Sequence, residues 1–300
     1  MAWRTAPSRV AVRIAARRLG LPRLAPRVAR SIPAATLAFG ITILSIWQVA
    51  VAANDPLRST PTAAWTVRLH PLIHQLETRH AELGRVEVVP TRSHREASAL
   101  VPYVNLARGW NRQADTARNP IFYNNTLTRA TYHAWLNRWA VRYVVLPSGP
   151  LDFAGTGEAA LVTAKPPYLH QVWSDRAWQL YTVANPTPLA TPHAAMIRFG
   201  PSEAVLRVAS PGNVLVRIPY SPWLSLIDRH GNAIEAPEPQ TPGLLPVNVD
   251  GCLSQREQPA GSGQPAEQWT ELHAPKPGVY RIAAPYTLPR GTTCPANMIG

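Results

Sequence analysis

The chain has 300 residues, 46% of them hydrophobic, which is long enough for a membrane segment and two folded domains. Its net charge is +13, but residues 1–34 carry eight of the 30 basic residues and none of the 17 acidic ones. The rest of the chain therefore has an excess of only five positive charges. A nucleic-acid-binding domain carries its positive charge on a folded surface, so this distribution argues against nucleic acid as a partner.

The first predicted element is a transmembrane helix over residues 32–53, a run of 22 residues without a charged side chain. At about 1.5 Å per residue, such a helix crosses a hydrocarbon core of about 30 Å. Eight arginines precede this run, whereas only Arg58 and Arg68 follow it closely, and basic flanks stay in the cytoplasm. We therefore expect residues 1–31 to be an Arg-rich cytoplasmic segment. The chain then crosses the plasma membrane once, and its C-terminal part is extracellular.

Asn54-Asp55-Pro56 is expected to end this helix, because proline cannot supply a backbone donor. A cleavable signal peptide is the alternative interpretation, with small residues at Ala50-Val51-Ala52 as its cleavage site. Its apolar run would then exceed the usual length of about 7–15 residues. We therefore favour an uncleaved anchor in the lipid bilayer.

Between residues 57 and 185, helix and strand signals alternate, which is typical of a small α/β layer domain. Apolar spacing predicts three helices in this domain. The first spans residues 61–83, the second follows a capping box formed by Ser93 and Glu96, and the third begins at Thr128. Strands are predicted over residues 85–89 and 141–146, followed by a hairpin within residues 172–183. Pro71 interrupts the first helix and suggests that it begins later.

From about residue 200 the apolar residues recur with a period of two, and turn residues separate short runs. Strands are predicted within residues 204–209, 213–220, 224–234, 269–273 and 279–283, which favours an antiparallel β-sandwich over residues 200–296. Residues 255–268 are interpreted as a polar, low-complexity loop. Cys252 and Cys294 are the chain's two cysteines, and an oxidising compartment outside the cytoplasm favours a disulfide between them.

The best candidates for a metal site are His70, His74 and His80 with Glu77, since residues four apart, such as His70 and His74, share one helix face. The zinc-protease pattern places a glutamate directly after the first histidine, where this chain has Pro71. We interpret these histidines as solvated side chains. The sequence therefore predicts no metal and no other cofactor.

Motifs of nucleophilic or phosphate-binding enzymes are missing from the sequence. The stretch Gly155-Thr156-Gly157-Glu158 lacks the third glycine and the preceding strand of a dinucleotide site. The carboxylates Asp152, Glu158, Asp175 and Glu203 are far apart in sequence, so we expect them at the surface and not paired for sugar chemistry. No catalytic residue is assigned.

The most distinctive stretch comprises residues 108–113 and 119–123. Aromatic faces together with amide and guanidinium donors suit saccharides, so four residues are candidate ligand contacts: Trp110, Arg112, Gln113 and Tyr123. The alternative is a structural loop whose aromatic side chains are buried and whose arginines bind backbone carbonyls. The sequence leaves both interpretations open.

Several segments carry a family resemblance: residues 109–113, 119–123, 132–136, 141–146 and 214–226. With the apolar helix, they resemble the last transmembrane helix and C-terminal external domain of actinobacterial polytopic membrane proteins similar to GT-C-type glycosyltransferases. The resemblance covers about residues 32–295. In those enzymes the catalytic carboxylate lies in the first external loop, between early membrane helices. The chain has no such loop, so the resemblance implies no catalytic residue here.

These observations together predict a membrane-anchored extracytoplasmic domain without its own catalytic site. Its expected partners are the lipid bilayer and either a glycan, a lipid-linked sugar or a multi-spanning membrane protein. The alternative is a terminal fragment or auxiliary subunit of a GT-C-like polyprenyl-phosphate-sugar glycosyltransferase. By itself the chain is not expected to be an enzyme; if it is part of one, that enzyme is expected to be a membrane glycosyltransferase.

Overall fold

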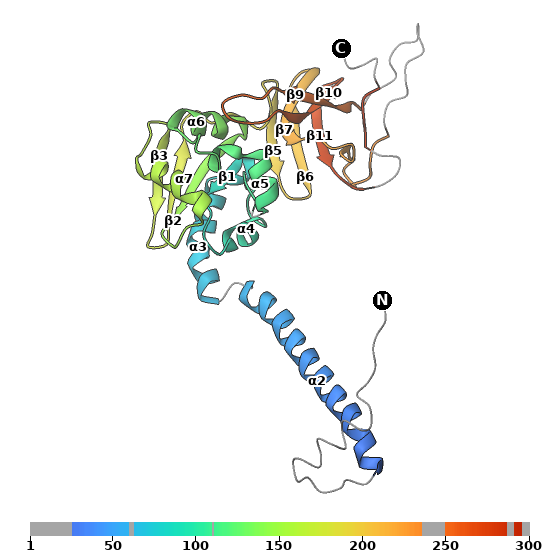
Figure 1. Cartoon of the computed structure of the whole chain (residues 1–300). Coiled ribbons are helices and arrows are strands. Elements are labelled where there is room, and N and C mark those ends of the chain that lie inside the picture. The colour runs from blue at the N-terminus through green and yellow to red at the C-terminus, as the bar shows by residue number, and fades with distance from the viewer. Residues whose placement is uncertain (1–25, 60–62, 110, 236–249, 287–290, 296–300) are drawn as a thin grey trace. The chain divides into compact units, whose positions relative to one another are not determined.

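The computed structural model describes residues 26–59, 63–109, 111–235, 250–286 and 291–295, which fall into two compact units (Figure 1). The first unit, Met1–Thr60, contains the helix α2 (Pro26–Ser59). The second unit, Pro61–Gly300, combines helices with predominantly antiparallel sheets.

Within α2, residues Ala35–Ala53 form the one stretch of the described chain that is long and apolar enough to cross a membrane. Its large side chains, including Leu37, Phe39 and Trp47, are more than half exposed. A membrane anchor and a signal sequence share these properties. The predicted span at residues 32–53 lies inside α2, but the predicted stop at Pro56 was wrong, because the helix continues to Ser59. Pro56 lies in the last turn, where it removes the one backbone hydrogen bond that its N–H would donate, and the helix keeps its conformation for three more residues.

The second unit begins with a four-stranded sheet whose order is β1-β2-β4-β3 (Figure 1). The strands β1 (Arg85–Val88) and β2 (Val141–Pro147) are parallel. The strands β3 (Leu169–Ser174) and β4 (Trp178–Val183) form the predicted hairpin, and β4 pairs antiparallel with β2.

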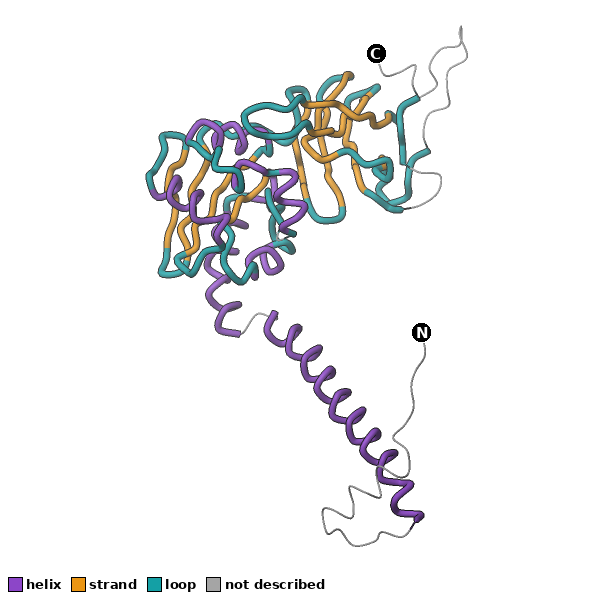
Figure 2. The backbone as a smooth tube through the Cα atoms, in the orientation of Figure 1, coloured by secondary structure: helices purple, strands orange, loops and turns teal. Residues whose placement is uncertain are grey.

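Helices accompany this sheet: α3 (Ala63–Thr78), α4 (Arg95–Leu100), α5 (Arg112–Arg118), α6 (Arg129–Arg138), α7 (Phe153–Thr163) and the short 3₁₀ helices η1 (Ala81–Leu83) and η2 (Pro120–Phe122) (Figure 2). Along β2, Val144 belongs to one buried cluster, and Tyr143 and Val145 belong to another. Because successive side chains of a strand point to opposite faces, both faces of this sheet are buried. Helix α6 begins after Thr128, which caps it as predicted.

Three local predictions were wrong. The Ser93–Glu96 capping box does not form: His94 is the N-cap residue, and the buried Glu96 carboxylate accepts hydrogen bonds from Thr91 instead. The helix α3 begins at Ala63 and contains Pro71, so it does not begin later. Strand β1 does not alternate, because all four of its residues are buried. Its charged side chains can be buried because each has polar or aromatic partners.

The C-terminal part forms two antiparallel sheets, with orders β5-β6-β11-β8 and β7-β10-β9. Their strands are β5 (Ala194–Phe199), β6 (Glu203–Val208), β7 (Gly212–Pro219), β8 (Ser225–Leu226), β9 (Cys252–Gln258), β10 (Glu267–Ala274) and β11 (Gly278–Ala283). Side chains from both sheets share one buried cluster, which includes Leu206, Val216, Leu272 and Ile282.

Two of these strands were not predicted. Strand β5 lies before residue 200, where the sequence placed the start of the sandwich, and β9 enters the segment predicted as a polar loop. The loop prediction for residues 255–268 was therefore wrong at both ends, since β9 extends to Gln258 and β10 begins at Glu267. The end of β9 is polar and exposed, so hydropathy does not reveal it.

Arg85 connects the first sheet to the C-terminal strands. Its guanidinium donates to the carbonyl oxygens of Trp139 at 2.8 Å and Arg217 at 2.6 Å. It also lies within 6.0 Å of the ring centres of Trp139, Phe199 and Trp269. Burial lowers the pKa of Arg85 to about 10, and the positive charge of Arg118 acts in the same direction. Cation–π contacts of this kind are strongest where water is excluded.

Candidate functional site

A pocket opens at the carboxyl end of the parallel strands β1 and β2. It is small, with a cavity volume of about 30 Å³, and it is partly open to solvent. Its lining comprises Val88, Pro90, His94, Glu96, Ala97, Leu106, Arg108, Gly109, Arg112, Asp115, Tyr123 and Asp152. Carboxyl ends of parallel strands are the usual ligand-binding edge of such sheets. Gly155 in α7 allows this arrangement, because a Cβ there would lie 2.9 Å from the Pro90 carbonyl oxygen.

Arg108 forms the base of this pocket, and its side chain is only 4% exposed. Its Nε and Nη2 donate to Oε1 of Glu87 at 2.9 and 2.7 Å, and Nη2 also donates to Glu158. Its Nη1 lies 3.6 Å from Asp115 Oδ2, and its guanidinium lies 3.6 Å from the ring centre of Phe122. Burial alone would lower the pKa of Arg108, but the surrounding carboxylates raise it above its ordinary value.

Glu87 and Glu158 lie behind Arg108, and both are fully buried. Arg108 Nη2 donates to both carboxylates, which brings them close together, and two negative charges so near each other in a buried site disfavour ionisation of both. The hydroxyl of Tyr132 donates to Glu158 Oε1 at 2.7 Å, whereas Glu87 Oε2 has no hydrogen-bond partner among the described residues. Burial raises the pKa of both carboxyl groups, and the charge of Arg108 opposes this effect. The pair therefore retains one proton above the ordinary carboxyl pKa.

This retained proton predicts a pH-dependent stability. The folded-state pKa of the pair is raised, so its contribution is fully present below the ordinary carboxyl pKa of about 4.3 and is lost as pH rises through the raised pKa. Over that window the free energy of unfolding should fall by about 1.4 kcal/mol for each pH unit. Urea titrations of the full chain in detergent, repeated at several values between about pH 5 and pH 9, measure how the free energy of unfolding falls with pH.

Glu87→Gln is the matched control for this measurement. The amide keeps the shape of the protonated carboxyl group and cannot ionise, so this variant should lose the pH dependence that the pair contributes. An unchanged dependence in the variant would show that the pair does not retain a proton in the folded chain.

The rim of the pocket is formed by Asp152, which caps α7 by accepting a hydrogen bond from the Ala154 amide. Arg112 Nη2 donates to Asp152 Oδ2 at 2.8 Å, and His94 Nε2 lies 3.5 Å from the same oxygen. Partial burial would raise the pKa of Asp152, but the hydrogen bond from Arg112 holds it below its ordinary value. A carboxylate and a guanidinium are thus fixed side by side at the opening.

Aromatic rings lie beside this rim pair. Phe153 is 65% exposed, and the Arg112 guanidinium carbon lies 4.4 Å from its ring centre. Tyr123 contacts Phe153 edge to face and donates its hydroxyl hydrogen to Asp115 at 2.5 Å. Burial raises the pKa of Tyr123 to about 12, and this hydrogen bond to Asp115 acts in the same direction, so the hydroxyl is held as a donor.

The structure separates the four predicted ligand contacts. Arg112 and Tyr123 line the pocket. Gln113 is exposed on α5 and is not part of the lining, and Trp110 lies outside the described residues.

Acidic residues of the site were missed or misplaced. Asp152 and Glu158 were expected at the surface, yet the Asp152 side chain is 11% exposed and Glu158 is fully buried. Neither Glu87 nor Asp115 was singled out. Glu87 and Glu158 bind Arg108, which is 21 and 50 positions away from them in the chain, so no local spacing reveals these pairs.

The histidines that were considered as metal ligands, His70 and His74, are not part of the pocket lining. His70 and His74 are exposed on α3. Among the residues that the structure describes, no group of three histidine, cysteine or acidic side chains is arranged to hold a metal ion.

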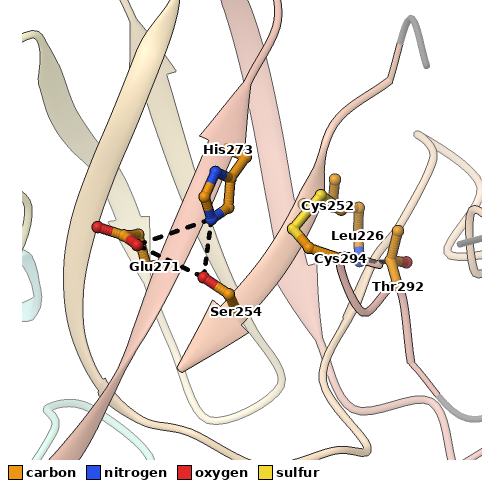
Figure 3. The surroundings of a disulfide bond; sticks show 7 residues. All are labelled: Leu226, Cys252, Ser254, Glu271, His273, Thr292 and Cys294. Carbon is orange, nitrogen blue, oxygen red and sulfur yellow. Dashed lines mark hydrogen bonds and ion pairs between the residues drawn. A yellow bond between two sulfur atoms is a disulfide. The ribbon is translucent and has the colours of Figure 1, made fainter. Parts of the chain in front are cut away.

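The disulfide between Cys252 and Cys294 lies beside a Ser–His–Glu cluster (Figure 3). Ser254 Oγ is 2.7 Å from His273 Nε2, and Glu271 Oε2 is 3.6 Å from the same nitrogen. In a hydrolytic triad the acid binds the opposite ring nitrogen and orients the imidazole. Ser254 is also only 1% exposed. This geometry does not support nucleophilic catalysis at Ser254.

Residues 191–299 match a protein family described as "Domain of unknown function (DUF8823)". The matched range contains the two antiparallel sheets and the disulfide, whereas the pocket lies outside it. No curated protein and no solved structure matches the chain.

Proposed function

We propose that the chain is a single-pass plasma-membrane protein whose extracytoplasmic part binds a glycan in the pocket at Arg108 and Asp152 and has no catalytic site of its own. In this proposal α2 is the anchor and the N-terminus is cytoplasmic. Residues 57–185 are an α/β domain, and residues 200–296 are a β-sandwich. The exposed apolar side chains of α2, the arginine asymmetry around it and the disulfide support this topology.

One observation supports glycan binding above others: the pocket opening places paired hydrogen-bonding groups beside an exposed aromatic ring. Sugar hydroxyls both donate and accept hydrogen bonds, so they suit a carboxylate next to a guanidinium, as in Asp152 and Arg112. The Phe153 ring, 65% exposed, offers an apolar face for the C–H groups of a sugar ring.

Replacement of Arg112 by alanine tests this function. The full chain in a mild detergent is screened against a panel of soluble neutral and acidic oligosaccharides by calorimetry. Arg112→Ala removes a charge-assisted donor at the rim and should weaken binding by about 10- to 100-fold. Stability should change by less than about 1 kcal/mol, because the Arg112 side chain is 42% exposed and its ion pair is partly solvated.

Gln113→Ala is the matched control on the same turn of α5, because Gln113 is exposed and lies outside the lining. It should bind the panel as the unmodified chain does. Equal losses in both variants, or no binding by the unmodified chain, would refute the pocket as a glycan site.

A further inference from the structure

Every cation in the pocket already has an acidic partner. Arg108 is held by Glu87 and Glu158, and Arg112 is held by Asp152. The lining contains three carboxylates against these two arginines. A negatively charged ligand would therefore face surplus negative charge without a free guanidinium to bind it, and such repulsion is an effective means of selectivity.

The base of the pocket nevertheless has hydrogen-bonding capacity to offer. Arg108 Nη1 is buried and has no hydrogen-bond partner in the described part of the chain. It lies 3.6 Å from Asp115 Oδ2, an ion-pair separation that is too long for a hydrogen bond. Nη1 has almost no exposed surface, so a ligand hydroxyl reaches it only after a small shift of the side chains that cover it; the hydroxyl can then accept from Nη1 and donate to Oδ2. A carboxylate or phosphate can only accept, and it would be repelled by Asp115.

Phe153 lies outside the pocket lining and supplies an apolar surface beside the opening, next to Arg112 and Tyr123. Its backbone directly follows Asp152 at the start of α7, and its ring is 65% exposed. The Arg112 guanidinium packs over the ring, and Tyr123 meets it edge to face. These contacts hold the ring beside the rim pair. An exposed ring held in this way is a platform on which a sugar can stack.

We infer that the pocket selects uncharged saccharides over acidic ones, with Phe153 as the stacking platform and with Arg108 and Asp115 as a shared binding point for one hydroxyl. This inference rests on the proposed function and specifies its ligand class.

The test compares neutral oligosaccharides with their acidic counterparts. Cellotetraose, mannotetraose and galactotetraose are titrated into the full chain in detergent, each beside the same backbone oxidised to the uronate at C6. The neutral member of at least one pair should bind about tenfold or more tightly than its uronate, because the uronate adds a charge next to fixed carboxylates.

Asp152→Asn provides a sharper test of the charge argument. Asparagine also caps helices well, so α7 keeps its first turn. The substitution removes one rim carboxylate and releases Arg112 from its ion pair. The ratio of the affinity for the neutral sugar to the affinity for its uronate should therefore fall by about tenfold, mainly because the uronate binds more tightly.

Phe153→Ala tests the platform, with Tyr286→Ala as the control, since Tyr286 is an aromatic residue that is 73% exposed and packs against Trp223, whereas Phe153 packs against Arg112. Only Phe153→Ala should weaken neutral binding, by about tenfold, without changing the preference over uronates.

Uronates that bind as well as or better than the neutral sugars would overturn the inference and leave glycan binding standing. Failure of all six sugars to bind would overturn the proposed function itself. A preference that Asp152→Asn does not change would also contradict the charge argument.

Discussion

Arg108→Met should destabilise the chain by about 3–5 kcal/mol, the loss typical when one partner of a buried ion pair is removed. Methionine fills much of the same volume but leaves Glu87, Glu158 and Asp115 around a buried site without their cation. The midpoint of urea unfolding of the full chain in detergent measures the loss. We expect a lower midpoint with little change in slope, since the fold itself is kept.

Arg112→Met is the matched control, because its partner Asp152 faces the rim and the Arg112 side chain is 42% exposed. It should cost less than about 1 kcal/mol. Adding Glu87→Gln to Arg108→Met should recover part of the loss, because it removes one of the uncompensated charges. A loss below about 1 kcal/mol for Arg108→Met, or no recovery in the double variant, would contradict the role given to this cluster.

Loss of the disulfide should cost about 4 kcal/mol on the chain-entropy model, because Cys252 and Cys294 are 42 residues apart in sequence. The double variant Cys252→Ser/Cys294→Ser should unfold at a correspondingly lower urea concentration. Both cysteines are buried, so two buried hydroxyl groups add a further cost where they find no partner.

A reducing agent provides the control for this prediction. It should lower the midpoint of the unmodified chain and leave the double serine variant unchanged. Thiol labelling of intact cells before lysis also tests the compartment, since a disulfide persists outside the cytoplasm and is reduced within it. Two freely labelled thiols in the folded chain would contradict the extracytoplasmic location.

Local pattern was sufficient for much of the fold. A 22-residue uncharged run predicted the apolar helix, and a period of two predicted β6, β7 and β11 close to their observed bounds. Thr128 predicted the start of α6. In each case the signal and the structure that it predicts lie in the same short segment.

Predictions from the local sequence pattern were wrong where tertiary contacts decided the structure. Glu96 accepts from Thr91 instead of capping α4, and the polar end of β9 is a strand because β10 pairs with it. Helix α7 escaped prediction, since it contains two glycines, of which Gly155 is needed for close packing against Pro90.

By itself the sequence determined the apolar helix, the change to β-structure near residue 200 and the pairing of the two cysteines, because two cysteines allow a single intramolecular pair. The tertiary structure alone decided the pocket. Glu87, Arg108 and Glu158 come from three separate segments. In the sequence of its own segment, each would be expected to lie on the surface, exposed to solvent. Folding removes them from water together, and burial makes each charge depend on the others. This mutual dependence, which no segment carries alone, gives the pocket its charge and its hydrogen-bonding capacity.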